Sequence, residues 1–96
     1  EIVRVDLRKI HNCISDFFVI CHASSDRQVD AISESIEEIV KKRSGDRPNT
    51  VEGKRNAEWI LIDYADVVVH VFKEEMRRLY ALEDLWADAP IEQLGD

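Results

Sequence analysis

The N-terminal quarter of the chain has the hydrophobic pattern of two strands. Val3, Val5 and Leu7 alternate with charged residues, and this period of two predicts a strand with one solvated face. Residues 16–21 are instead mostly apolar on both faces, which is typical of a central strand covered on both sides. Residues 9–15 are mixed in character and are expected to connect the two strands.

A long amphipathic helix is predicted to follow. Ser25 and Gln28 have the spacing of a capping box, in which the hydroxyl and the amide reciprocally satisfy backbone N–H groups of the first turn. Gly45 is a suitable end for the helix, because glycine readily takes the left-handed conformation found there. At helical spacing, the apolar stripe consists of Val29, Ile32, Ile36, Ile39 and Val40.

Two β-rich runs then predict a hairpin. Residues 59–64 and 67–72 are separated only by Ala65 and Asp66, and a further short strand is expected before them at 49–52. Neither loop residue is glycine, although a tight hairpin turn requires positive φ at one or both positions. Ala65 is therefore either strained, or the turn is a longer, bulged type.

A second helix is predicted over residues 73–87, which carry a broad apolar stripe and must end before Pro90. Arg77 and Arg78 are expected on its solvated face, with pairing to a carboxylate or phosphate as the alternative. The order strand, strand, helix, strand, hairpin, helix predicts an α/β fold, a mixed β-sheet with helices packed on it. Residues 1–96 are expected to form a single domain with one core.

The two faces of the predicted hairpin differ in composition. One face carries aliphatic side chains and, by parity, Tyr64, and it is expected to be core. The opposite face pairs Trp59 with Phe72, Leu61 with His70, and Asp63 with Val68. Aromatic rings mixed with an imidazole and a carboxylate are typical of a binding surface. The alternative is that the second helix covers this face, with His70 and Asp63 at the margin.

Charge and composition narrow the classes of partner. The chain has 13 Lys and Arg against 20 Asp and Glu, a formal charge of −7. An acidic surface repels a phosphate backbone, so we expect a basic protein partner and no direct sequence-specific contact with nucleic acid. Without a membrane-length apolar run or a signal segment, we expect a cytoplasmic protein that does not contact membranes. Cys13 and Cys21 are expected to be reduced thiols.

The sequence contains no motif for phosphate cradling or nucleophilic catalysis, since GxGxxG, GxxxxGK[ST] and GxSxG are all absent. Asp63 and Asp66 could be metal ligands, although at a hairpin tip Asp more often bonds local backbone. The His and Cys residues at 11–13 and 21–22 match no zinc spacing. Neither a metal nor a cofactor is therefore expected.

Several segments carry a family resemblance when they are taken together. They are residues 15–20, 24–29, 51–53, 57–72 and 77–86. In this order and spacing they resemble the ribosomal silencing factors, the Iojap family, across nearly the whole chain. The resemblance implies a nucleotidyltransferase-like α/β fold without that superfamily's Gly-Ser motif and paired catalytic carboxylates, and hence no enzyme activity. The chain departs from the family pattern at Ala65, where Gly is common, and in lacking an N-terminal helix before the first strand.

The resemblance also implies a function and a partner. Family members bind a large-subunit ribosomal protein, number fourteen in its series, on the face that meets the small subunit. This blocks subunit association sterically and represses translation when nutrients are short. The implied partner-binding residues are Trp59, Asp63, Tyr64, Asp66, His70 and Phe72, with Arg77, Tyr80 and Glu83 as neighbours. The alternatives are a degenerate nucleotidyltransferase-like protein that binds nucleotide and metal, or a homodimeric scaffold that uses the same hairpin face.

Overall fold

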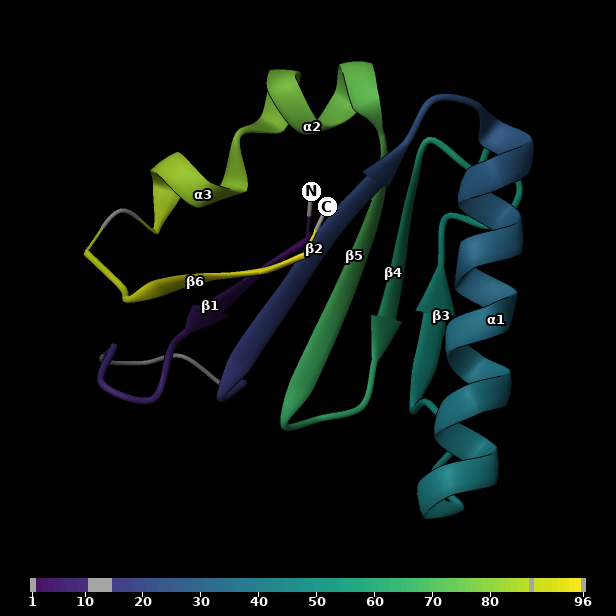
Figure 1. Cartoon of the computed structure of the whole chain (residues 1–96), viewed down its shortest axis with the longest axis horizontal. Coiled ribbons are helices and arrows are strands. Elements are labelled where there is room, and N and C mark those ends of the chain that lie inside the picture. The colour runs from purple at the N-terminus through teal and green to yellow at the C-terminus, as the bar shows by residue number, and fades with distance from the viewer. Residues whose placement is uncertain (1, 11–14, 87, 96) are drawn as a thin grey trace.

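One mixed β-sheet with helices on both faces forms the protein (Figure 1). The structure, a computed structural model, describes residues 2–10, 15–86 and 88–95, apart from the side chain of Glu83. Within them the strands are β1 (Ile2–Asp6), β2 (Phe17–Ala23), β3 (Thr50–Glu52), β4 (Trp59–Asp63), β5 (Val67–Lys73) and β6 (Ile91–Gly95). The helices are α1 (Asp26–Ser44), α2 (Glu74–Tyr80) and α3 (Leu82–Leu85). The predicted α/β class with a mixed sheet is confirmed.

The strand order is β3-β4-β5-β2-β1-β6. The strands β2 and β5 run parallel at the centre, and the other neighbouring pairs are antiparallel. The crossover from β2 to β5 passes through α1 and the β3-β4 pair, as a parallel pair requires. Both central strands finish at the end of the sheet where α2 begins (Figure 1).

Helix α1 begins and ends where its capping residues predict. Ser25 Oγ accepts a hydrogen bond from the Gln28 N–H at 3.2 Å. The reciprocal half of the predicted capping box is wrong, because Gln28 Oε1 accepts from Ser24 N–H at 3.2 Å and Ser24 Oγ at 2.7 Å, one residue earlier. Gly45 ends the helix with φ of +75° and donates its N–H to the Lys41 carbonyl at 2.9 Å.

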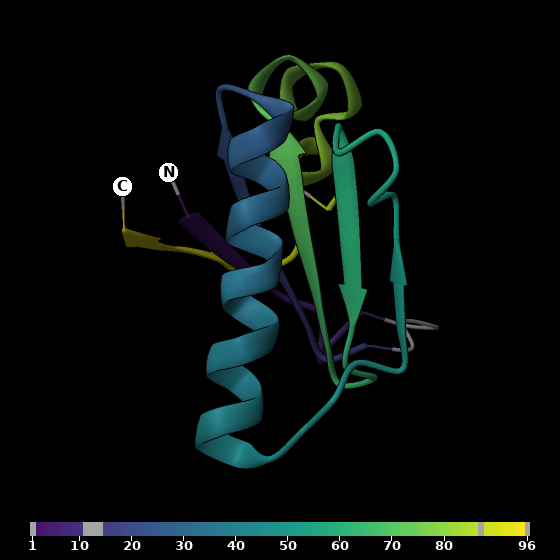
Figure 2. The same ribbon diagram turned by 90° about the vertical axis from the view of Figure 1, so that its right-hand side faces the viewer.

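The first core lies between α1 and the sheet. Its buried residues are Cys21, Val29, Ala57, Ile60, Ile62, Val69 and Val71. Tyr64 packs against them, so the aliphatic face of the hairpin is core as predicted. Ile39 is 49% exposed, and its predicted place in the buried stripe is wrong. Helix α1 runs along one face of the sheet (Figure 2). Ile39 lies at the edge of the apolar stripe, about 80° around the helix from Val29, whereas half-buried Val40 lies only about 20° from it.

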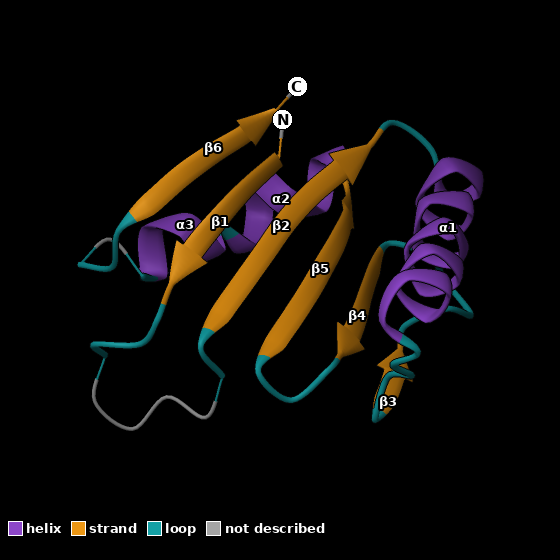
Figure 3. Ribbon diagram, turned by 60° about the horizontal axis from the view of Figure 1, so that its bottom comes forward, coloured by secondary structure: helices purple, strands orange, loops and turns teal. Residues whose placement is uncertain are grey.

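The second core lies on the opposite face, where α2 and α3 lie behind the strands in Figure 3. Its buried residues are Val3, Val5, Leu7, Ile20, Phe72 and Ala89. Partly buried Phe18, Trp59, Met76, Leu82 and Trp86 pack against them. The aromatic face of the hairpin therefore points into this second core, and the alternative in which C-terminal helical structure covers it holds.

The predicted register of the hairpin is confirmed, with Trp59 opposite Phe72 and Leu61 opposite His70. Ala65 has φ of +72°, so the strained two-residue turn is the correct alternative. The Tyr64 N–H donates to the carbonyl of Val67 at 2.9 Å and closes the loop. A non-glycine residue in this conformation is destabilising by about 1–2 kcal/mol.

The single helix predicted over residues 73–87 is wrong. The chain breaks at Ala81, which has φ of +45° and separates α2 from the one-turn α3. The break lets Met76 on α2 and Leu82 on α3 both pack against the second core. Tertiary packing thus overrides the local preference of this stretch for one continuous helix.

Strand β6 was not predicted from the sequence. It pairs antiparallel with β1 at the edge of the sheet, and Glu92 forms an ion pair with Arg4 at 2.7 Å. Most of its side chains are exposed. An edge strand without a covered face needs no alternation of apolar and polar residues, so the residues Ile-Glu-Gln-Leu-Gly carry little strand signal.

Candidate functional site

The residues implied to bind a partner lie on different sides of the sheet. Tyr64 faces α1 and the first core, whereas Trp59, His70 and Phe72 face the second core. Phe72 is 1% exposed and His70 is 4% exposed, so neither can contact a partner directly. Trp59 is half-buried. The structure therefore separates the hairpin residues into those that could touch a partner and those that support them.

Aromatic side chains pack together where β4 and β5 meet α2. The Trp59 ring stacks on Phe72 with centroids 4.9 Å apart, and it contacts Tyr80 at 4.6 Å. The Trp59 Nε1–H donates a hydrogen bond to His70 Nδ1 at 3.0 Å. Phe18 from β2 contacts His70 edge to face at 4.6 Å. Such ring pairs stabilise by about 0.5–1.5 kcal/mol each beyond the area they bury, so they strengthen this part of the second core.

Helices α2 and α3 carry exposed apolar side chains close in sequence to Tyr80. Leu79 and Leu85 are each 71% exposed, and Tyr80 is 46% exposed. We define the α2–α3 surface as Trp59, Leu79, Tyr80 and Leu85. Sequence analysis assigned the two leucines to the apolar stripe of one helix. The signal that could have found them is the breadth of that stripe, because one face of a helix cannot bury so many apolar residues.

The charged residues implied near this surface have different surroundings. Arg77 is only 7% exposed, and its Nη1 lies 2.7 Å from His22 Nδ1 on β2, so its predicted place on a solvated helix face is wrong. It faces the sheet and ties α2 to β2, while its neighbour Arg78 is solvated and bonds Glu74 at 3.4 Å. The side chain of Glu83 lies outside the described part of the structure.

The hairpin tip has a structural explanation. Asp63 Oδ1 accepts a hydrogen bond from the Ala65 N–H at 2.7 Å, so this carboxylate stabilises the strained turn as the backbone-bonding alternative predicts. Asp66 is exposed, and its backbone carbonyl accepts a hydrogen bond from the Asp16 N–H at 2.8 Å. Among the described residues no group of three His, Cys, Asp or Glu side chains could hold a metal ion. His11 and Cys13 lie outside the described residues.

Cys21 is a buried free thiol on β2, and its pKa is raised because burial disfavours the thiolate. No helix in the described ranges is both long enough and apolar enough to cross a membrane.

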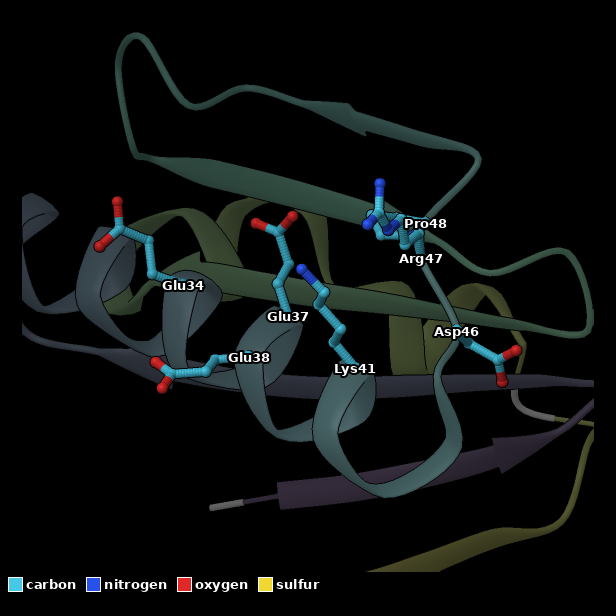
Figure 4. A pocket seen from close by; sticks show the side chains of 7 residues that line it. All are labelled: Glu34, Glu37, Glu38, Lys41, Asp46, Arg47 and Pro48. Carbon is cyan, nitrogen blue, oxygen red and sulfur yellow. The ribbon is translucent and has the colours of Figure 1, made fainter.

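A cavity of about 580 Å³ lies on the other side of the molecule, between α1 and the loop that follows it (Figure 4). Its lining residues are Glu34, Glu37, Glu38, Lys41, Asp46, Arg47 and Pro48. Glu37 is paired with Lys54 at 2.9 Å, and Glu38 with Lys42 at 3.2 Å. Burial raises the pKa of Tyr64, and the nearby carboxylates of Glu37 and Asp46 raise it further. These ion pairs make the cavity a solvated charged groove.

The imidazole of His70 is held neutral. Burial lowers the pKa of His70 from 6.5 to about 4, because the charged form loses its hydration inside the second core. In the unfolded chain the same group takes up a proton near pH 6.5. Between these two pKa values the unfolded state binds more protons than the folded state, so the free energy of unfolding falls as the pH falls.

We expect the parent protein to lose about 2 kcal/mol of unfolding free energy through His70 between pH 7.5 and pH 5.0. Urea denaturation at both pH values measures the loss. The variant His70→Leu lacks the titrating group. Over the same pH range it should therefore lose about 2 kcal/mol less unfolding free energy than the parent. An equal pH dependence in the two proteins would refute the neutral, buried state of the imidazole.

Comparisons with known proteins agree with this architecture. The family described as "Ribosomal silencing factor during starvation" matches residues 1–96. The chain is 42% identical over 94 residues to the ribosomal silencing factor of Halalkalibacterium halodurans, a match that covers 98% of this chain and 79% of that protein. It is also 32% identical over 74 residues to "Mitochondrial assembly of ribosomal large subunit protein 1" of Mus musculus, over 75% of this chain and 32% of that protein.

A solved structure supports the same assignment. The crystal structure of a protein from Chromobacterium violaceum matches with a TM-score of 0.84 and 30% identity, over 100% of this chain and 75% of that one. Sequence and fold thus agree over the same residues, and the chain belongs to the family of ribosomal silencing factors.

Proposed function

We propose that this protein binds the large ribosomal subunit through its ribosomal protein number fourteen, on the face that meets the small subunit. Bound there, it blocks subunit association sterically and represses translation. It acts where the ribosome is, in the bacterial cytoplasm or the equivalent compartment. The protein is a binding factor in this proposal, and its main contacts come from the α2–α3 surface.

The observation that carries the proposal is the exposed apolar character of the α2–α3 surface. Leu79 and Leu85 at 71% exposure, with Tyr80 at 46%, lie within seven consecutive residues. Behind Tyr80, the Trp59 ring stacks on Phe72. Exposed apolar residues grouped in this way mark interaction sites, and rigid Trp and Tyr side chains are the residues that most often dominate binding energy.

Charge supports a ribosomal protein as the partner. The chain carries a formal charge of −7. An acidic protein associates faster with a basic protein and is repelled by exposed RNA phosphates. The name of the Mus musculus relative also refers to the large ribosomal subunit. Asp63, Tyr64 and Asp66 remain proposed as peripheral contacts, separate from the α2–α3 surface, because the hairpin tip lies at the opposite end of β5 from α2 (Figure 1).

Co-sedimentation with isolated large subunits tests the binding step, and light scattering during the mixing of large and small subunits tests the blocking step. We expect the protein to sediment with large subunits and to remain in the supernatant when only small subunits are present. We also expect it to lower the yield of joined ribosomes. Failure to sediment with large subunits would refute the proposal. Binding that leaves subunit joining unchanged would refute the steric block.

A further inference from the structure

His70 is a polar side chain placed in the middle of an apolar core. It lies on β5 next to Phe72, and only 4% of it is exposed. Its Nδ1 accepts the hydrogen bond from the Trp59 indole at 3.0 Å. A neutral imidazole that accepts at Nδ1 carries its proton on Nε2. That Nε2 is buried and has no hydrogen-bond partner among the described residues.

Packing alone does not explain an imidazole at this position. A buried N–H group without a partner is unfavourable, and an aliphatic side chain would fill the space without that cost. The neighbours Val69 and Val71 on β5 are aliphatic and buried in the first core. His70 also contacts the Phe18 ring edge to face, but a phenylalanine ring could make such a contact as well. The feature particular to the imidazole is its acceptor nitrogen, which is bonded to Trp59.

Trp59 is the residue whose orientation this bond controls. Its indole stacks on Phe72 with an interplanar angle of 28° and leans on Tyr80 at 48°. Stacking restrains the plane of a ring but permits sliding within that plane, whereas a hydrogen bond is directional. The bond from Nε1 holds one edge of the indole toward His70, so the ring always presents the same face to Tyr80.

We propose that His70 is a positioning residue that fixes the Trp59 indole beneath Tyr80, so that the α2–α3 surface is rigid before its ribosomal partner arrives. The inference rests on the function proposed above, because the partner is the large subunit. A side chain held in its bound orientation loses less conformational entropy on association, and affinity rises for that reason. His70 itself does not touch the partner.

Two substitutions separate positioning from packing. His70→Leu retains an apolar side chain of similar bulk and removes the acceptor. His70→Asn places its Oδ1 close to the position of Nδ1 and restores an acceptor for the indole. At pH 7.5 we expect His70→Leu to bind large subunits about tenfold more weakly than the parent, and His70→Asn to recover most of this loss. Urea denaturation midpoints test whether both variants are folded under the binding conditions.

A signal from the free protein reports on the Trp59 indole directly. The chain has two Trp residues, and the variant Trp86→Phe assigns the indole N–H resonance of Trp59 in ¹⁵N–¹H spectra. We expect this resonance to move upfield and its hydrogen exchange to accelerate in His70→Leu, and to stay close to the parent position in His70→Asn.

The two measurements distinguish the inference from the proposed function. An unchanged Trp59 resonance in His70→Leu overturns the inference, whether or not the parent binds the ribosome. A shifted resonance with unchanged affinity also overturns it, because the orientation of Trp59 would then not matter to the partner. Affinity lost equally in His70→Leu and His70→Asn assigns the effect to packing and overturns it as well. A parent protein that fails to bind large subunits refutes the proposed function itself.

Discussion

Gly53→Ala is expected to lower the free energy of unfolding by about 3–5 kcal/mol, a large part of the stability of a domain of this size. Gly53 follows β3 with φ of +88°, a conformation that alanine adopts with difficulty. A Cβ added there would lie 2.0 Å from the backbone carbonyl oxygen of Trp59. The turn must open to relieve this contact, and it would displace Trp59, the first residue of β4.

Gly45→Ala is the matched control for this prediction. Gly45 also has positive φ, at +75°, but an added Cβ would meet no atom within 4 Å. Only the conformational cost applies there, about 1 kcal/mol. Urea denaturation of the parent and both variants gives the comparison. Equal losses for the two glycines would show that the approach of Gly53 to Trp59 is not the source of the effect.

Tyr80→Ala is expected to weaken binding to the large subunit about 30-fold, which corresponds to about 2 kcal/mol. Tyr80 is 46% exposed and leans on Trp59 at 4.6 Å, so it combines a free outer surface with a rigid support. An aromatic residue with these properties at the centre of an interface is the usual position of a binding hot spot. The dissociation constant from co-sedimentation with increasing amounts of large subunits measures the effect.

Ile39→Ala controls for the loss of any exposed apolar side chain. Ile39 is 49% exposed, close to the exposure of Tyr80, but it lies on α1 against the opposite face of the sheet. Its removal should leave affinity for the large subunit unchanged. Similar losses in the two variants, or full binding by Tyr80→Ala, would contradict the assignment of the interface to the α2–α3 surface.

The candidate site was predictable from the sequence only in part. Alternation along the hairpin correctly placed Trp59 and His70 on the same face, because pairing across a two-residue loop determines which side chains are neighbours. Whether that face was open or covered depended on the chain beyond residue 73. Burial of His70 and half-burial of Trp59 follow from the packing of α2 and α3 over the sheet and from the side chain of Phe18 on the neighbouring strand β2. Those contacts join residues far apart in the sequence.

The sequence by itself determined the features that depend on neighbouring residues. The limits of α1 follow from a serine cap and a glycine end, and the hairpin register follows from alternation and a short loop. The strain at Ala65 was one of two outcomes that its loop length allowed. In each case the determining interactions span only a few residues, so the local pattern carries enough information.

Only the tertiary structure decided the features that depend on distant partners. The break at Ala81 exists because two short helical segments cover the second core, and Arg77 is buried because β2 brings His22 beside it. Strand β6 forms because its backbone pairs with the edge of β1. Leu79 is 71% exposed although it is apolar, which the sequence pattern did not reveal. The free energy of each feature comes from contacts across the sheet, and local propensity is too weak to oppose them.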